Sequence, residues 1–191
     1  MTTVSIIGTG TMGQAIATIV RNGGNEVELL GRADADRAPA GDVVVLAVPY
    51  PAVADVLAAH GAHLAGKVVV DITNPLNFET FDALVVPADS SAAAEIAAAL
   101  PDSRVVKAFN TTFAGTLASG TVGPLTTTVL VAGDDDAAKT TVADIVRAGG
   151  LEAADAGSLR RARELEALGF LQITLAAREQ VAWTGGFGVV R

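Results

Sequence analysis

Three glycines at fixed spacing, directly after an apolar run at residues 4–7, are the feature of this sequence that most clearly indicates chemistry. The loop consists of Gly8, Thr9, Gly10, Thr11, Met12 and Gly13. In a phosphate cradle the first glycine makes a tight strand-to-helix turn, the second admits a pyrophosphate, and the third packs helix against strand. We therefore predict that this loop binds a dinucleotide, with the amide groups of the following helix facing its phosphates.

The residues around the loop support this interpretation. Apolar residues follow at helical spacing, from Ala15 to Val20, and Gly23 and Gly24 end the pattern before a second apolar run at residues 27–30. A glycine loop between a strand and a helix is far more specific than the glycines alone. An unrelated glycine-rich turn is the weaker alternative.

The residue that would contact the adenosine ribose indicates which dinucleotide is bound. An acidic side chain about twenty positions after the glycines suits the free 2′-hydroxyl of NAD, whereas an arginine accommodates the 2′-phosphate of NADP. This chain has Gly31 and Arg32 there. NADP(H) is therefore favoured, although a solvated loop arginine would have the same sequence.

Further site residues are expected where the strands end, because open α/β sheets bind ligands outside the carboxyl ends of their strands. Six such residues are assigned to the cofactor: Ala47, Val48, Pro49, Thr73, Asn74 and Pro75. Asn74 could meet the nicotinamide carboxamide, or the Asn-Pro pair could simply form a turn. Asn110 and Thr111 follow the next strand and are expected to border an electron acceptor.

Few residues offer acid–base chemistry. Lys107 and Asn110 are weak catalytic candidates that could together polarise a carbonyl. His60 and His63 are expected at the amino ends of the strands, away from the cofactor. Hydride transfer between two bound rings needs little beyond positioning and exclusion of water, so a sparse site suits that reaction.

A glycine in the last helical pattern also points to the acceptor site. Gly169 interrupts a helix, where glycine costs about 1 kcal/mol relative to alanine. Either a second helix or a flat ring is expected to approach the backbone at this position, which we assign to the border of the acceptor site.

Composition excludes several other functions. The 191 residues include no cysteine and only two histidines, so disulfides, thiol catalysis and a metal site are not expected. The net charge of −8 argues against nucleic acid as a partner. The start has no basic segment, and glycines and polar residues break the first apolar stretch, so neither a signal peptide nor a membrane span is expected. A cytoplasmic location follows as an expectation.

Strand-like and helical patterns alternate along the chain. Strands are expected at residues 43–48, 67–72 and 104–109, with helices at 53–59 and 91–100, but residues 31–42 are too short and polar for the usual second helix. A strand at 127–131, a helix at 137–148 capped by an aspartate, and a strand at 151–154 follow. The pattern predicts an α/β, Rossmann-like, doubly wound and mostly parallel sheet.

The end of the chain is expected to form a short helical extension. We divide the chain into an NADP-binding domain at residues 1–156 and a closing helix and tail at 157–191. The helix, expected at residues 159–181, has apolar side chains on several faces, and one small sheet cannot cover them all. A homodimer through this helix is therefore predicted.

These residues, taken in order, resemble the family of coenzyme F420-dependent NADP oxidoreductases over essentially the whole chain. The resemblance rests on the loop at 8–13 and on segments 91–96, 105–108, 133–136 and 155–157, followed by Arg163 and Glu166. It implies a small dimeric Rossmann protein that passes hydride between NADP(H) and a deazaflavin lying against the nicotinamide. Residues 106–111 also resemble the cytosolic reductase domain of six-transmembrane epithelial antigen metalloreductases, which join NADPH to a flavin.

The sequence thus predicts an NADP-dependent oxidoreductase whose exchangeable, small-molecule acceptor is coenzyme F420, FMN or FAD. Two alternatives remain at this level. The motif around Thr11 and Met12 is also similar to that of hydroxyacid dehydrogenases and pyrroline carboxylate reductases, which suggests a carbonyl or imine reductase. The shortened second crossover would suit an NADP-sensing protein without catalytic activity.

Overall fold

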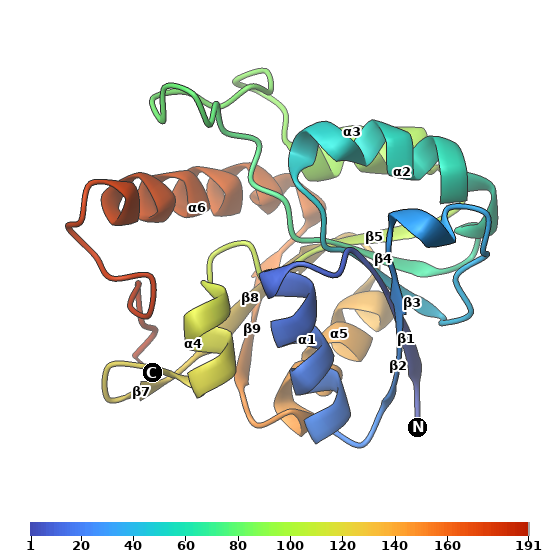
Figure 1. Cartoon of the computed structure of the whole chain (residues 1–191), viewed down its shortest axis with the longest axis horizontal. Helices are drawn as coiled ribbons and strands as arrows, with labels where there is room; N and C mark the ends of the chain where they lie inside the picture. Colours follow the sequence, from blue (N-terminus) through green and yellow to red (C-terminus); the bar gives the residue numbers. More distant parts are fainter. Residues whose placement is uncertain (191) are drawn as a thin grey trace.

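A single seven-stranded sheet organises the computed structural model, which describes residues 1–190 (Figure 1). Its strand order is β2-β1-β3-β4-β5-β8-β9. The strands are β1 (Thr3–Ile7), β2 (Glu26–Leu30), β3 (Val43–Leu46), β4 (Val68–Asp71), β5 (Arg104–Lys107), β8 (Thr128–Gly133) and β9 (Glu152–Gly157). The first five run parallel, β8 pairs antiparallel with β5, and β9 pairs parallel with β8. The predicted mostly parallel, doubly wound sheet is confirmed.

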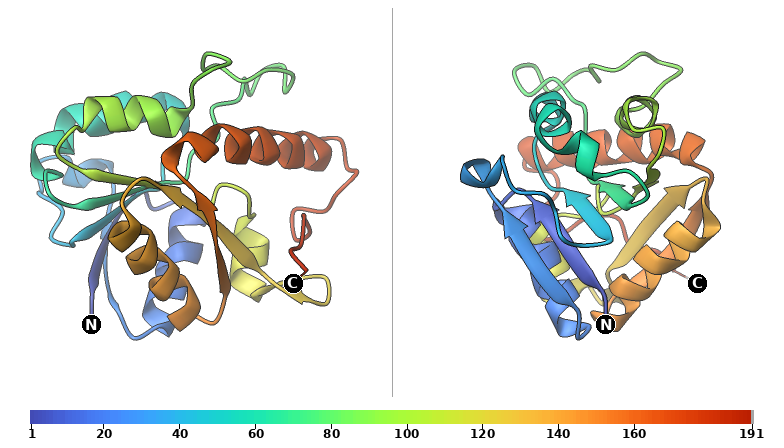
Figure 2. Two further views of the ribbon diagram at one scale, coloured as in Figure 1. Left: turned by 180° about the vertical axis from the view of Figure 1, so that it is seen from behind. Right: turned by 90° about the vertical axis from the view of Figure 1, so that its right-hand side faces the viewer.

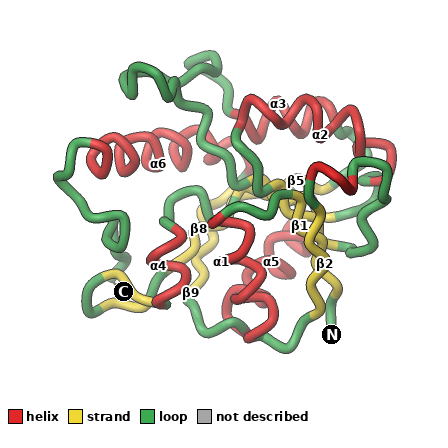
Figure 3. The backbone as a smooth tube through the Cα atoms, in the orientation of Figure 1, coloured by secondary structure: helices red, strands yellow, loops and turns green. Residues whose placement is uncertain are grey.

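Helices cover both faces of this sheet (Figure 2). One face carries α1 (Thr11–Asn22), α4 (Ala114–Ser119) and α5 (Asp136–Ala148), and the other carries α2 (Val53–His60), α3 (Ala92–Ala99) and α6 (Ala162–Ala177). Short 3-10 turns precede or follow several of them: η1 (Arg32–Asp34), η2 (Tyr50–Ala52), η3 (Gly61–His63) and η4 (Leu159–Arg161). Figure 3 shows the loop between β4 and α3 extending beyond the helix layer.

Two apolar cores explain why the strand sequences are apolar at nearly every position. In β3, Val43 and Val45 pack on the side of α1 and α5, whereas Val44 and Leu46 pack on the side of α2 and α3. Successive side chains of a strand point to opposite faces, and both faces are covered here.

Local signals determine where two of the helices begin. The Asp135 carboxylate accepts a hydrogen bond from the Ala138 amide at 2.7 Å, and the Ser91 hydroxyl accepts one from the Ala94 amide at 3.0 Å. Both side chains satisfy an amide that a helix start leaves without a partner. The predicted aspartate cap of α5 is confirmed.

The second crossover contains only η1, as the polar and short sequence predicted. The sequence prediction missed α4 and the hairpin of β6 (Thr121–Val122) and β7 (Leu125–Thr126). It also made the closing helix too long, because Glu179 adopts a left-handed conformation with φ of 58° that turns the chain back. The returning tail is held where the Phe187 amide donates to the Gln172 side chain at 3.2 Å.

Within residues 1–190, none of the helices combines the length and the apolar character needed to cross a bilayer. The proposed division of the chain at residue 156 stays a prediction.

Candidate functional site

The glycine loop has the geometry that its spacing predicts. Gly8 has φ of 121°, and a Cβ atom there would lie 2.1 Å from the Ala47 carbonyl oxygen. A Cβ on Gly13 would lie 2.1 Å from the Gly8 carbonyl oxygen, so only glycine lets α1 start this close to β1. A Cβ on Gly10 would meet nothing within 4 Å. The space in front of Gly10 is therefore free for a ligand at the N-terminus of α1.

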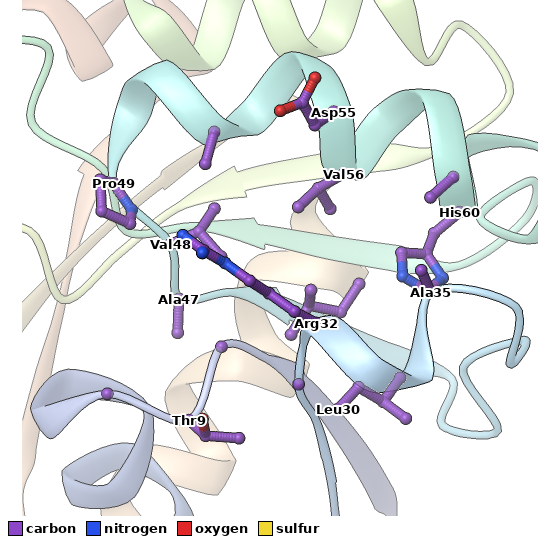
Figure 4. A pocket seen from close by; sticks show the side chains of 16 residues that line it. Thr9, Leu30, Arg32, Ala35, Ala47, Val48, Pro49, Asp55, Val56 and His60 are labelled. Atoms are coloured by element: carbon purple, nitrogen blue, oxygen red, sulfur yellow. The ribbon is translucent and has the colours of Figure 1, made fainter.

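A first cavity of about 330 Å³ opens at the carboxyl ends of β1, β2 and β3 (Figure 4). Its wall combines the glycine loop, the start of η1, the end of β3 and one side of α2. The lining residues are Ile7, Gly8, Thr9, Gly10, Leu30, Gly31, Arg32, Ala35, Ala47, Val48, Pro49, Ala52, Asp55, Val56, Ala59 and His60. Most of the predicted cofactor residues thus come together in one place.

Arg32 is the cation available in this cavity. Its neighbour Arg37 is engaged on the surface, 3.0 Å from a Glu28 carboxylate oxygen and 2.9 Å from an Asp34 oxygen. No carboxylate of the part of the chain described here forms an ion pair with Arg32. Figure 4 shows its side chain lying across the cavity toward Val48. Arg32 therefore has a guanidinium to offer to a phosphate.

Two carboxylates hold the loop that carries Arg32. Burial would raise the pKa of Glu28, but hydrogen bonds, including one from the Ser5 hydroxyl, and the Arg37 charge lower this pKa overall. Hydrogen bonds from the Gly31 amide and from Arg37 lower the pKa of Asp34. Both groups are thus held as anions, and they occupy Arg37 rather than Arg32.

A second cavity of about 520 Å³ lies beside the start of α1. Its wall is mostly apolar and comes from four separate segments of the chain. The lining residues are Thr11, Met12, Ile72, Asn74, Phe78, Phe81, Asn110, Thr112, Phe113, Ala114, Gly115, Ile173, Trp183 and Thr184. The Phe113 and Trp183 ring centroids are 4.9 Å apart, and those of Phe78 and Phe81 are 5.8 Å apart. This cavity suits a flat ring system.

A pair of asparagines provides polar groups in this apolar cavity. The Asn74 side-chain nitrogen donates to the Asn110 carbonyl at 2.9 Å. The Asn110 side-chain nitrogen donates to the Asn74 side-chain oxygen at 2.9 Å and to the Leu165 carbonyl at 2.8 Å. The Asn110 side-chain oxygen is buried and has no partner among residues 1–190. The orientation of the Asn110 amide is thus set by the two hydrogen bonds that its nitrogen donates.

The strained backbone of the preceding residue, Phe109, determines the position of Asn110. The preceding residue, Phe109, is buried and has φ of 63°, a left-handed conformation that is unfavourable for a bulky side chain. Such strain costs roughly 1–3 kcal/mol and persists only where the surrounding packing enforces it. Here it turns the chain sharply after β5, so that Asn110 faces Asn74.

Gly169 has a different role from the one expected. A Cβ there would lie 2.3 Å from the Asn74 side-chain oxygen and 2.9 Å from the Asn110 carbonyl oxygen. The glycine therefore lets α6 pack against the asparagine pair, and it does not line the second cavity. Thr111 is also outside this cavity and lines a smaller pocket with Gln172. The assignment of both residues to the border of an acceptor site stays a prediction, and the second cavity does not support it.

Lys107 is not available to a substrate. Its ammonium is fully buried and donates to Asp71 at 2.8 Å, to the Thr73 carbonyl at 2.6 Å and to Glu166 at 2.8 Å. Its three donors are all used, so the weak candidacy of Lys107 as a carbonyl-polarising group is not supported. Together with Asn110, which the structure places in the second cavity, it forms no catalytic pair.

The same network ties α6 to the sheet. Glu166, on α6, also accepts hydrogen bonds from the Ala92 and Ala93 amides at 2.9 and 3.2 Å, at the start of α3. Burial raises the pKa of Glu166, against the opposing effect of the Lys107 charge. Lys107 also holds Thr73, so the turn that presents Asn74 rests on this buried network.

The remaining predicted cofactor residues lie outside the lining of the first cavity. Thr11 and Met12 line the second cavity, although they belong to the glycine loop that borders the first. Thr73 and Pro75 are buried on either side of Asn74 and line neither cavity. The loop and the start of α1 thus separate two adjoining spaces.

The expectation for His60 was wrong. The residue ends α2, and α2 passes along the first cavity, so the His60 ring lies in the cavity wall near Ala35 (Figure 4). The sequence position between two strands did not reveal this, because the direction in which α2 crosses the sheet is a tertiary property.

The sequence analysis also missed the aromatic walls. The chain has one tryptophan, one tyrosine and six phenylalanines, and four of these eight residues line the second cavity. Phe78 and Trp183 lie outside helices and strands and are 52% and 54% exposed. The signal available in the sequence was that these few aromatic residues fall in segments without a helical or strand pattern.

Comparison with known proteins identifies the family. Residues 27–75 match the family described as NADP oxidoreductase coenzyme F420-dependent. The F420-dependent NADP reductase of Methanocaldococcus jannaschii is 33% identical over 171 residues, covering 87% of this chain and 76% of that protein. A crystal structure of a candidate F420-dependent NADP reductase from Arthrobacter sp. FB24 superposes with a TM-score of 0.85 at 28% identity and covers both chains completely.

A relationship over a shorter part of the chain extends to a metalloreductase. The metalloreductase STEAP3 of Rattus norvegicus is 40% identical over 105 residues, which are 55% of this chain and 20% of that protein. The relationship to the methanogen reductase covers most of both chains and agrees with the family match and the full-length structural match. The chain therefore belongs to the family of F420-dependent NADP oxidoreductases and is an NADP-dependent oxidoreductase.

Proposed function

We propose that this protein transfers hydride between NADP(H) and a deazaflavin of the coenzyme F420 type. The observation that carries the proposal is that two cavities border one glycine loop. Gly8 and Gly10 line the first cavity, while Thr11 and Met12 line the second. A dinucleotide held on this loop would have one half in each space, with its reactive ring beside the apolar cavity.

The first cavity fits the adenosine half of NADP. The open space at Gly10 and the amides at the start of α1 suit a pyrophosphate, since a helix N-terminus favours anions. Arg32 would pair with the 2′-phosphate through charge-assisted hydrogen bonds. Asp34 is occupied by Gly31 and Arg37, so its carboxylate does not compete for Arg32.

The second cavity fits two flat rings. Asn74 and Asn110 would orient the nicotinamide through its carboxamide, and Phe113 and Trp183 would cover the acceptor ring and exclude water. The bound nicotinamide supplies the hydride, so these residues need only position the rings. FMN, FAD and riboflavin have similar rings and are alternative acceptors.

A carbonyl or imine reductase is supported less well. Hydride addition to C=O or C=N leaves a strongly basic oxygen or nitrogen that a positioned acid must protonate, whereas a reduced flavin or deazaflavin ring is a delocalised anion that can take its proton from water. Among the described residues, the side chains lining the second cavity include no Asp, Glu, His, Lys or Tyr. Lys107 is fully engaged, and Tyr50 donates to Glu95 and lines neither cavity.

The test is anaerobic oxidation of NADPH by the purified protein with coenzyme F420, FMN, FAD or riboflavin, and with NADH in parallel. We expect rapid turnover with NADPH and coenzyme F420. Turnover with ketones or imines, and with none of the ring acceptors, would contradict the proposal.

We further infer a homodimer that forms through α6. Leu171 on this helix is 49% exposed and Phe187 in the returning tail is 46% exposed, although Gln172 holds the two segments together. Burial of these side chains by a second copy would remove them from water. Sedimentation should detect a dimer that Leu171→Glu dissociates, and a monomeric parent protein would refute the inference.

A further inference from the structure

We propose that Gln172 is a positioning residue for the acceptor. Its side chain anchors residues 181–186 as a strap across the second cavity, and this strap moves aside when the acceptor enters or leaves. Because it takes the second cavity as the place where the acceptor ring binds, this assignment rests on the proposed function. It identifies the segment that closes the cavity and the residue that holds this segment.

The strap forms one side of the second cavity. After α6 the chain turns back and returns to α4, as Figures 1 and 2 show. Trp183 and Thr184 line the cavity, and the Trp183 ring packs against the Phe113 ring. A Cβ on Gly115 would lie 2.9 Å from the Trp183 carbonyl oxygen, so this glycine lets the backbone of the strap rest directly on α4.

Gln172 is a buried polar side chain outside the second cavity. It is 2% exposed, and its side-chain oxygen accepts the hydrogen bond from the Phe187 amide, directly after the strap. A Cβ on Gly186 would lie 3.1 Å from the same oxygen, so the backbone passes close to the side chain. A buried polar group is unfavourable unless it is hydrogen-bonded, and this one is bonded to the returning chain. Gln172 thereby fixes the end of the strap.

The strap is the most weakly attached part of the cavity wall. Within residues 1–190, residues 181–186 form no hydrogen bond to another segment, and the bond from Phe187 is the first that ties the returning chain down. The asparagines in the wall are instead joined by two hydrogen bonds, and Glu166 ties α6 to the sheet. Segments with few hydrogen bonds open at the lowest free energy, and movements of such segments admit and release substrates in many enzymes.

The first test uses Trp183 as the reporter, because it is the only tryptophan of the chain. Gln172→Met keeps the length of the side chain and removes the accepting oxygen, so acrylamide quenching of Trp183 fluorescence should rise in the ligand-free protein. Gly115→Ala displaces the strap from its other side and should raise the quenching as well. Gln180→Met is the matched control and should leave it unchanged, since the Gln180 side chain donates to the nearby Arg178 carbonyl.

Kinetics separate positioning of the acceptor from general support of the fold. In Gln172→Met the KM for coenzyme F420 should rise roughly fivefold, the factor expected for one lost hydrogen bond. The KM for NADPH should stay at the parent value, and kcat should stay equal or rise. In the parent protein, hydrogen exchange of residues 181–187 should slow when coenzyme F420 and NADP⁺ are bound together.

Quenching in Gln172→Met that equals the parent value would overturn the anchoring role of Gln172. Weaker NADPH binding or a lower kcat in this variant would show that α6 as a whole had moved, and would also overturn it. Unchanged hydrogen exchange on binding of both cofactors would refute closure of the strap over the acceptor. If the parent protein turns over none of the ring acceptors, the proposed function fails, while quenching in the ligand-free variants still decides whether Gln172 anchors the strap.

Discussion

The two cavities are built in opposite ways. The first is formed by residues between Ile7 and His60, is bordered by backbone at the glycine loop, and carries one unpaired arginine. The second combines segments from Thr11 to Thr184, is walled by aromatic side chains, and has a pair of asparagines beside a buried ionic network. A phosphate cradle can be encoded in one short stretch, whereas an apolar pocket for a ring needs parts of the whole chain.

This difference also separates the sources of specificity. The first cavity offers charge to a ligand, through a helix N-terminus and the exposed Arg32. The second offers an apolar shape, beside asparagines whose orientation depends on Gly169 and on the strained Phe109. Substitutions in the two regions should therefore have separable effects on cofactor and acceptor.

The largest expected effect comes from the network that supports the second cavity. Lys107→Met should lower the free energy of unfolding by about 3–5 kcal/mol, because it leaves the Asp71 and Glu166 carboxylates buried without their cation. Urea unfolding of the parent protein and the variant measures this difference in the free energy of unfolding. Lys139→Met is the control and should lower the free energy of unfolding much less, since its partners Asp136 and Asp155 are exposed and water screens such pairs. Equal losses in the two variants would contradict a special role for the buried network.

Arg32 tests the electrostatic character of the first cavity. Arg32→Ala should weaken NADPH binding by about 2 kcal/mol, roughly thirtyfold in the dissociation constant. NADH binding should be weakened much less, because only NADPH carries the 2′-phosphate. Calorimetric titration with both cofactors measures the difference. Equal weakening of NADPH and NADH binding would contradict the assignment of Arg32 to the 2′-phosphate. Arg37→Ala should have the smaller effect, since Glu28 and Asp34 already hold that side chain.

A pair of glycine substitutions would separate the two regions directly. Gly169→Ala pushes a methyl group into Asn74, which we propose orients the nicotinamide, and should lower hydride transfer roughly tenfold, about 1.4 kcal/mol, with a smaller loss of NADPH affinity, because the adenosine half and its phosphates bind elsewhere. The methyl group added by Gly10→Ala would meet no protein atom within 4 Å, but it would enter the space that we propose for the pyrophosphate. This substitution should therefore weaken NADPH binding. Steady-state kinetics and NADPH titration distinguish the two. If Gly169→Ala left hydride transfer unchanged, the proposed role of the asparagine pair would fail.

The smallest effect concerns pH and the loop that carries Arg32. The folded protein lowers the pKa of Glu28, so the ionised group adds stability above its unfolded pKa of about 4.3. This contribution, about 1 kcal/mol or less, is lost as pH falls through the lower folded pKa. The difference in unfolding free energy between the parent protein and Glu28→Gln should therefore shrink from pH 7 to pH 3. A difference that grows on acidification would contradict this account.

Local sequence accounts for much of the fold and for the first cavity. The glycine loop, the missing second helix and the Asp135 cap all follow from residues close together in the chain, and each is found in the structure. Contacts between distant segments were the ones that sequence reasoning missed or misassigned. His60, Gly169 and the aromatic walls belong to this group.

Local sequence suffices to predict the strand–glycine loop–helix unit, because the left-handed φ of Gly8 and the contact of Gly13 with the Gly8 carbonyl both lie within the loop. The burial of Lys107 between two carboxylates, the packing of α6 against Asn74 and the return of Trp183 to Phe113 follow from the tertiary structure alone. Those contacts join residues far apart in the chain, so they depend on how helices cross the sheet and not on any local preference.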